Sequence, residues 1–127
     1  MENDDEVILL VQPDSQHLRA VRLLAADAGG RAGLDVSEVD DLRIAVDELF
    51  QALLEHAEER IVLRVVRLGR RVVIRGSART RQRGEAPQLG NVAELIVDAV
   101  CDSYTLERDD DKVSFMVTKR AQRMVPA

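Results

Sequence analysis

Hydrophobic residues recur along this chain with two different periods, and the changes of period divide it into strands and helices. Residues 7–11 form a continuous apolar run that predicts a β-strand. Apolar positions at helical spacing follow in residues 18–28, with Asp14 or Ser15 as a suitable N-cap. The glycines in residues 29–33 are expected to end this first helix, because glycine readily adopts the left-handed conformation of a C-cap.

The longest amphipathic pattern lies in residues 38–57, where apolar side chains recur every three or four positions. Ser37 is a suitable N-cap, and Asp41 suits the positive end of the helix dipole. This pattern predicts a second helix over residues 38–57. Its polar face carries the acidic residues Asp41, Glu48, Glu55 and Glu59.

The period then changes to that of strands. Residues 60–67 and 71–75 are rich in valine and isoleucine and flank Leu68-Gly69-Arg70, which predicts a hairpin. After a polar loop at residues 76–91 we expect a third helix over residues 91–101. A second hairpin is expected from residues 103–107 and 112–119.

This order of elements favours a single α+β domain over residues 1–127. Runs of helices and runs of strands, without strict alternation, favour a two-layer α/β sandwich. Its helices are expected on one face of a mainly antiparallel (mixed) sheet. Residues 1–6 and 121–127 are expected to be flexible tails.

Composition narrows the class of protein. Hydrophobic residues make up 46% of the chain, but there are only three aromatic residues, Phe50, Tyr104 and Phe115. A core of aliphatic side chains is therefore expected, and a base-stacking surface is disfavoured. One cysteine, an acidic N-terminal stretch and no apolar run of about 20 residues favour a cytoplasmic protein with no membrane segment.

Charge is unevenly distributed. Residues 1–59 contain 15 acidic and 4 basic residues, whereas residues 60–83 contain nine arginines and no acid. Such a division is typical of an interaction surface, although arginines at alternate strand positions also occur simply because they face water. The acidic chain as a whole disfavours direct binding of nucleic acid.

Several kinds of site are disfavoured by the absence of their motifs. His17, His56 and Cys101 lie at no spacing typical of metal ligands, so no metal is expected. The chain contains neither of the common glycine-rich phosphate loops and no recognisable nucleophile elbow.

Residues 41–57, Asp-Leu-Arg-Ile-Ala-Val-Asp-Glu-Leu-Phe-Gln-Ala-Leu-Leu-Glu-His-Ala, resemble the N-box helix of anti-sigma-factor serine kinases, members of the histidine-kinase-like (GHKL) ATPase superfamily. Residues 18–22 are similar to the first helix of that family, and residues 91–102 to the helix after its ATP lid. The short actinobacterial anti-sigma proteins offer the best match. The resemblance implies a GHKL fold over nearly the whole chain.

The resemblance also implies which residues matter. Glu48 matches the glutamate that activates the attacking hydroxyl, although it also suits an ordinary surface carboxylate. The family's magnesium ligand, an asparagine four residues later, is Ala52 here, and Gln51 points about 100° away around the helix. A methyl group cannot coordinate Mg²⁺, which prefers oxygen ligands.

Two further departures affect the nucleotide site. After Val72-Val73-Ile74 the family has an Asp-x-Gly-x-Gly box that binds adenine, whereas this chain has Arg75-Gly76-Ser77-Ala78-Arg79. The glycine-rich lid is reduced to Gly84 and Gly90. Gly76 and Gly90 are thus remnants of the motifs, and neither bound nucleotide nor catalysis is expected.

The function implied is that of an anti-sigma factor, which sequesters an RNA-polymerase sigma factor and is released by a STAS-type anti-anti-sigma protein. Two alternatives stay open: an active serine kinase that uses ATP and Mg²⁺ to phosphorylate that antagonist, and a degenerate GHKL module of another complex. A homodimer through the sheet edge and the first helix is expected. The candidate partner-binding residues are Arg19, Arg22, Arg79, Arg81 and Arg83.

Overall fold

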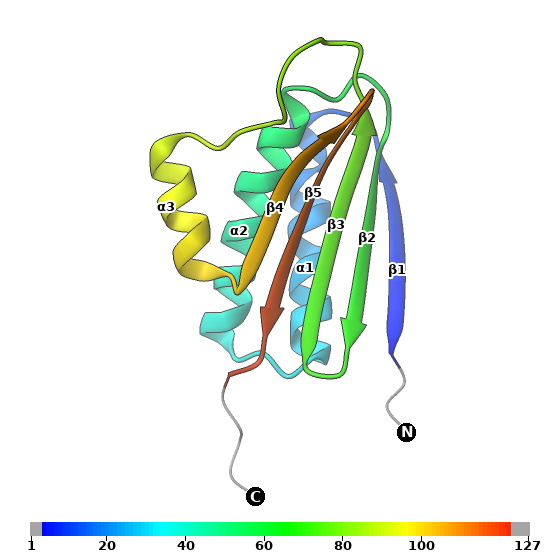
Figure 1. Cartoon of the computed structure of the whole chain (residues 1–127). Helices are drawn as coiled ribbons and strands as arrows, with labels where there is room; N and C mark the ends of the chain where they lie inside the picture. The colour runs from blue at the N-terminus through cyan, green and yellow to red at the C-terminus, as the bar shows by residue number, and fades with distance from the viewer. Residues whose placement is uncertain (1–3, 123–127) are drawn as a thin grey trace, which may run out of the picture.

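Within residues 4–122, five antiparallel strands and three α-helices form two layers, with the three helices on one face of the sheet (Figure 1). The structure is a computed structural model in which residues 4–122 are described. The sheet has the order β1-β2-β3-β5-β4, and each neighbouring pair is antiparallel. The predicted fold class, a two-layer α/β sandwich with its helices on one face of the sheet, is confirmed, and the sheet is antiparallel throughout. In chain order the elements are β1 (Asp5–Val11), a 3₁₀ turn (Ser15–His17), α1 (Leu18–Arg31), α2 (Val36–Leu54), β2 (Ile61–Leu68), β3 (Arg71–Arg79), α3 (Asn91–Val100), β4 (Ser103–Asp109) and β5 (Lys112–Arg120).

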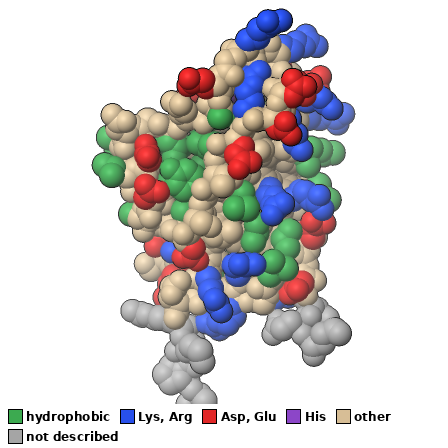
Figure 2. Space-filling model, viewed as in Figure 1, with side chains coloured by type: hydrophobic (Ala, Val, Ile, Leu, Met, Phe, Trp, Pro, Cys, Tyr) green, Lys and Arg blue, Asp and Glu red, His purple; other side chains and the backbone are tan. Residues whose placement is uncertain are grey.

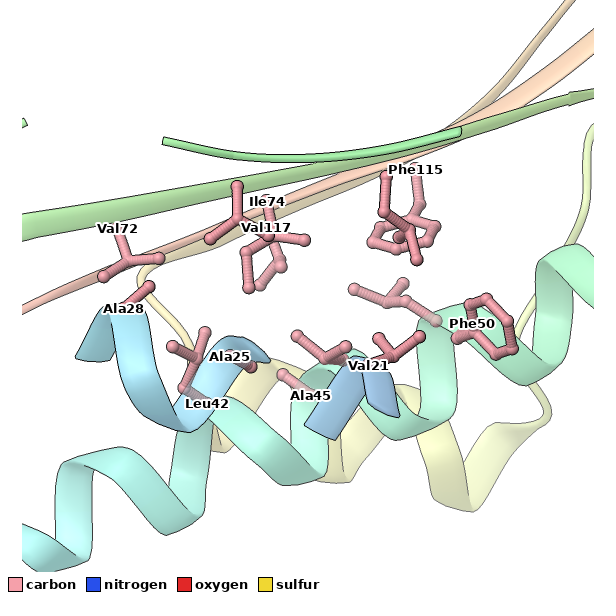
Figure 3. Close-up of a cluster of buried hydrophobic side chains, with 14 of the residues drawn as sticks. Val21, Ala25, Ala28, Leu42, Ala45, Phe50, Val72, Ile74, Phe115 and Val117 are labelled. Atoms are coloured by element: carbon pink, nitrogen blue, oxygen red, sulfur yellow. The ribbon is translucent and has the colours of Figure 1, made fainter. Parts of the chain in front are cut away.

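The core lies between the sheet and helices α1 and α2 (Figure 3). Alternate residues of β3 and β5 point toward the helices, so Ile74 and Val117 are almost fully buried. Leu42 and Ala45 of α2 face them from the other layer and are fully buried. Helix α2 lies between α1 and α3 and forms the centre of its layer (Figure 1).

Helix α2 begins earlier than the sequence pattern predicted. Its N-cap is Asp35 instead of Ser37, because Asp35 and Glu38 form a reciprocal capping box. The Glu38 amide donates a 2.8 Å hydrogen bond to Asp35, and the Asp35 amide donates a 3.0 Å bond to Glu38. The helix ends at Leu54, three residues before the predicted end.

Strand β3 is four residues longer than predicted. Residues 76–79, which were expected to open a loop, continue the ladder with β5, where Ser77 pairs with Ser114 and Arg79 with Lys112. The connection that follows β3 therefore covers residues 80–90 only.

The N-terminal tail was predicted too long. Asp5 and Glu6 belong to β1, and both form ion pairs: Asp5 with Arg31 and Arg67, Glu6 with Arg64. The hydrogen bond from Arg31 is the main cause that lowers the pKa of Asp5. The other parts of the two predicted tails, residues 1–3 and 123–127, lie outside the described residues.

The C-terminal end is also fixed as far as it is described. The Ala121 amide donates to the Arg70 carbonyl at 2.9 Å, and the Gln122 amide donates to the Glu38 carboxylate at 2.7 Å. Within residues 4–122, no helix combines the length and the apolar character that crossing a bilayer would require.

Candidate functional site

The candidate nucleotide site is centred on the face of α2 that points toward α3. Asp41 and Glu48 are seven residues apart, so they share one face of the helix. This face of α2 lies next to α3, as two contacts of Lys119 in β5 show. The Nζ atom of Lys119 lies 3.6 Å from the Asp41 carboxylate, and it donates a 3.0 Å hydrogen bond to the carbonyl of Val100 in α3. The buried lysine thus links α2 to the C-terminal end of α3.

Glu48 is half-buried on this face. Within residues 4–122 it forms no hydrogen bond or ion pair, so its carboxylate is not committed to another side chain. Its position is compatible with the general-base role that the resemblance implies. Position alone does not supply the metal and the adenine contact that phosphoryl transfer also needs.

Ala52 lies one turn after Glu48 and is only 7% exposed. Its surroundings are those of the protein interior, where the family has an oxygen ligand for Mg²⁺. Gln51, the nearest amide, is exposed and points elsewhere. Within the described residues no group of three or more His, Cys, Asp or Glu side chains is arranged to hold a metal ion.

Gly76, which we interpreted as a remnant of the adenine-binding box, has a packing role. A Cβ atom added at this position would lie 2.3 Å from Cε2 and 2.8 Å from Cζ of the Phe115 ring. The neighbouring strand β5 therefore requires glycine here whether or not a nucleotide binds. Gly90, by contrast, is the N-cap of α3, and an added Cβ there would have no atom within 4 Å.

Residues 80–90 connect β3 to α3, where the resemblance implies an ATP lid, and their first part is hydrogen-bonded to the rest of the fold. The side chain of Gln82 donates a 3.2 Å hydrogen bond to the Glu55 carbonyl at the end of α2. The amide of Arg81 donates to the Glu58 carboxylate, and the Gln82 carbonyl accepts from Arg108 of β4. These contacts fasten the segment to α2 and to the β4–β5 hairpin.

Arg22, a candidate partner-binding residue, is engaged within the chain. Its guanidinium donates two hydrogen bonds of 3.0 Å, from Nε and from an Nη atom, to the two oxygens of Asp47 in α2. This fork geometry is the strong form of an arginine–carboxylate pair. The Arg22 side chain is still 40% exposed. Arg19, one turn earlier on α1, is exposed and has no such pair within the described residues.

The other candidate partner-binding arginines, Arg79, Arg81 and Arg83, lie at the same end of the molecule as Arg19. In Figure 1 the start of α1, the end of α2 and the 80–90 connection meet at one end of the sandwich. Arg79, Arg81 and Arg83 are exposed there, and Figure 2 shows Lys and Arg side chains gathered at that end. Arg79 pairs with Asp111 at 2.7 Å. The fold thus brings together candidates that are about 60 residues apart in the chain.

Two partnerships were missed by sequence reasoning. Nothing in the spacing of Asp47 identifies it as the partner of Arg22, because the pair depends on how α1 packs against α2. Lys119 did leave a signal: it continues the alternation of the apolar residues Val113, Phe115 and Val117, which predicts a lysine on the inner face of β5.

Comparison with known proteins identifies the fold of this chain but does not identify its family. No family model matches the chain, and no curated protein matches it significantly in sequence. Thirteen chains of solved structures match in three dimensions. One of them is described as the crystal structure of the RsbU and RsbW domains of Rv1364c from Mycobacterium tuberculosis, with a TM-score of 0.71 and 17% sequence identity. The match covers 97% of this chain but only 34% of the Mycobacterium chain, so the present chain is similar in fold to about a third of that protein.

Proposed function

We propose that this protein is a regulator that works by binding other proteins: an anti-sigma factor that sequesters a sigma factor and releases it to a STAS-type antagonist. The observation that carries the proposal is the buried Ala52, because a GHKL-like fold with a methyl group at the magnesium position lacks the central element of its chemistry. The resemblance of the second helix to anti-sigma kinases supports the proposal. So does the fold similarity to a structure that contains an RsbW domain.

The kinase alternative is disfavoured at two further points. A working site needs an acidic side chain to bind the adenine amino group, but the end of β3 carries Arg75 and Arg79. The residues in the place of the lid are bonded to Glu55 and Glu58 at the end of α2. A segment held in this way is less free to close over a ligand.

The basic end of the molecule is the surface that we assign to the sigma factor. Arg19, Arg79, Arg81 and Arg83 are exposed at this end and would attract an acidic partner. Arg22 lies one turn after Arg19 on α1 but pairs with Asp47, so binding a partner through Arg22 requires exchange of one carboxylate for another. Competitive exchange of this kind suits a protein that alternates between two partners.

A homodimer through β1 and α1 is part of the proposal. Strand β1 is at the edge of the sheet, and its outward side chains Ile8 and Leu10 are 55% and 56% exposed. Leu23 of α1 is 64% exposed. An apolar edge strand is a ready template for pairing with a second chain. Light scattering should give about twice the 14.2 kDa monomer mass at tens of micromolar. The monomer mass would contradict the dimer.

Titration calorimetry with MgATP tests the absence of nucleotide binding directly. We expect no binding heat, whereas a magnesium-dependent dissociation constant below about 100 μM, near 5.5 kcal/mol, would promote the kinase alternative. Ala52→Asn is the informative variant, because it restores the amide but not the adenine contact. It should still bind no nucleotide, and it should lose about 1–3 kcal/mol of stability because a polar group enters a buried position.

A binding measurement separates the anti-sigma role from the more general one. Partners captured from the host should include a sigma factor that purified protein then binds in isolation. If no sigma factor binds and another protein does, the degenerate GHKL module of another complex is the better description.

A further inference from the structure

Helix α3 presents a stripe of apolar side chains to solvent. Val92 and Leu95 are each 70% exposed and Ile96 is 37% exposed, and Ala99 is exposed one turn later. These residues have the spacing i, i+3, i+4 and i+7, so they lie along one side of the helix. We call them the α3 stripe. In Figure 2 hydrophobic side chains gather at the left, where Figure 1 places α3.

The helix is held in place by a different part of its circumference. Val97 is its one buried residue, with Val100 half-buried, and Lys119 donates to the Val100 carbonyl. The stripe is therefore not what attaches α3 to α2. A stripe of this kind on a well-anchored helix is the usual surface by which one amphipathic helix accepts another.

The surroundings of the stripe are acidic. Residues 84–107 contain five acidic residues and no lysine, arginine or histidine, in contrast to the arginine-rich segment just before them. Glu94 and Asp98 lie on α3 itself, both on the side of the stripe that Leu95 borders. Burial raises the pKa of Tyr104 in β4, and the nearby charges of Asp98 and Glu94 raise it further. Lys119, the nearest base, is buried and already engaged.

The acidic residues near the α3 stripe favour one kind of binding partner over others. A second copy of the chain that docked through its own α3 would place Glu94 and Asp98 against the same acids of its partner. An anionic membrane surface would repel them in the same way. A helix with basic residues on either side of its apolar face would instead gain charge complementarity at the rim of the contact.

We propose that the α3 stripe is a docking site for an amphipathic helix of another protein, whose apolar face is flanked by lysines or arginines. A hollow lined by Leu89, Glu94, Tyr104 and Leu106 adjoins α3 and would receive one of those basic side chains beside Glu94. The site is opposite in charge to the basic end that we assign to the sigma factor. The proposed α3 site does not depend on the assignment of the basic end to a sigma factor. It gives the molecule a second partner of a different class.

The test uses a fluorescein-labelled helical peptide with leucines at i, i+3, i+4 and i+7 and lysines on both sides, with fluorescence anisotropy as the readout. A control peptide has the same leucines and glutamates in place of the lysines. We expect the lysine peptide to bind at least about tenfold more tightly than the control. Its affinity should fall as salt is raised, because exposed charges are screened.

Substitutions on α3 and α1 test whether the peptide binds at the α3 stripe. Leu95→Gln and Val92→Gln should each weaken the lysine peptide by about tenfold without affecting folding, since both side chains are 70% exposed. Leu23→Gln, on α1, is the matched control: it removes a side chain that is 64% exposed and should leave peptide binding unchanged. Glu94→Gln combined with Asp98→Asn should remove the preference between the two peptides.

Four results would overturn the proposal. They are failure of both peptides to bind, equal affinity for the two peptides, equal effects of Leu95→Gln and Leu23→Gln, and a dimer or a vesicle-bound form that Leu95→Gln abolishes. Vesicles of phosphatidylcholine with phosphatidylglycerol serve for the last measurement. Dimerisation that survives Leu95→Gln belongs to the β1 edge and leaves the proposal in place.

Discussion

Arg22 of α1 holds Asp47 of α2 through two hydrogen bonds of 3.0 Å, and this pair joins the two helices next to Glu48. The two side chains are 40% and 25% exposed, so the pair contributes little to stability, about 0–1 kcal/mol. The pair has a larger effect on whether Arg22 is available to bind a partner. Arg22, a candidate partner-binding residue, is already occupied by a carboxylate of its own chain.

Replacing Asp47 should therefore release Arg22 for a partner. We expect Asp47→Asn to tighten binding of the sigma factor by about three- to tenfold, because no internal carboxylate has to be displaced. Stability should fall by less than about 1 kcal/mol. Surface plasmon resonance and urea denaturation measure the two effects.

Asp27→Asn is the control for that measurement. Asp27 pairs with Arg31 at 3.0 Å near the C-terminal end of α1, so the change removes the same charge without releasing Arg22. Equal effects of the two substitutions would mean that only net charge matters. Arg22→Ala should speed dissociation, as expected for a contact near the centre of an interface.

The contact between Gly76 and Phe115 leads to a second prediction. Gly76→Ala should destabilise the protein by about 1–3 kcal/mol, because the new methyl group would lie 2.3 Å from the ring and force it to move. The cost should shrink when Phe115 is replaced by leucine, and a double-mutant cycle in urea measures that coupling.

Gly30→Ala is the matched control for the glycine prediction. Gly30 lies inside α1, and an added Cβ there would meet no atom within 4 Å. Alanine should therefore stabilise the helix by about 0.5–1 kcal/mol, the opposite sign. If both substitutions stabilise the protein, the ring does not restrict position 76.

The fold followed from the sequence because its signals are local and consistent. The changes of hydrophobic period located all five strands and three helices, and the separate runs of helices and strands indicated two layers. Boundaries failed where a local signal was ambiguous. Ser37 is as good an N-cap as Asp35, and only the reciprocal bond with Glu38 decides between them. Gly76 suggested the end of a strand, but its role is to make room for a ring on the neighbouring strand.

The candidate site followed only in part, because its contacts join segments far apart in the chain. Glu48 and Ala52 were identified from the resemblance of one helix to a known family. The pairing of Arg22 with Asp47 depends on the relative rotation of two helices, which spacing within each helix does not determine. The exposure of the α3 stripe could not be predicted either, since the sequence does not reveal which side of an apolar helix the sheet leaves uncovered.

Cys101 should be an unreactive thiol in the folded protein. Burial raises its pKa from 9.0 to about 11, and Asp102 and Asp98 add to the effect. Because the thiolate is the reactive form, the reaction with DTNB at pH 8 should be on the order of 100-fold slower than in the unfolded chain. Equal rates in buffer and in denaturant would contradict this prediction.

The same shift predicts how stability depends on alkaline pH. The folded-state pKa lies above the unfolded value, so the neutral thiol favours the folded protein below pH 9. That contribution is lost as pH rises from 9.0 toward 11. Cys101→Ala should remove this part of the pH dependence, and urea denaturation at several pH values tests it.

The arginines of the basic end give the prediction that best separates the functional hypotheses. Arg79, Arg81 and Arg83 are exposed, and long-range attraction by such charges mainly accelerates encounter and weakens with salt. Replacing all three by alanine should slow association with the sigma factor and flatten its salt dependence, while the dissociation rate changes little. The loss of the exposed pair between Arg79 and Asp111 should cost no more than about 1 kcal/mol.

The control is a second triple variant that loses three positive charges from a different part of the surface. Arg64, Arg71 and Arg120 are exposed residues of strands β2, β3 and β5 that lie outside residues 79–90, so replacing these three by alanine removes three positive charges but leaves the basic end intact. Association kinetics at two salt concentrations should separate the two triple variants clearly. If both variants slow association equally, net charge and not the basic end attracts the partner. If only the first variant is affected and the loss is in binding to RNA or DNA, the arginines serve nucleic acid, and the anti-sigma proposal loses its binding surface.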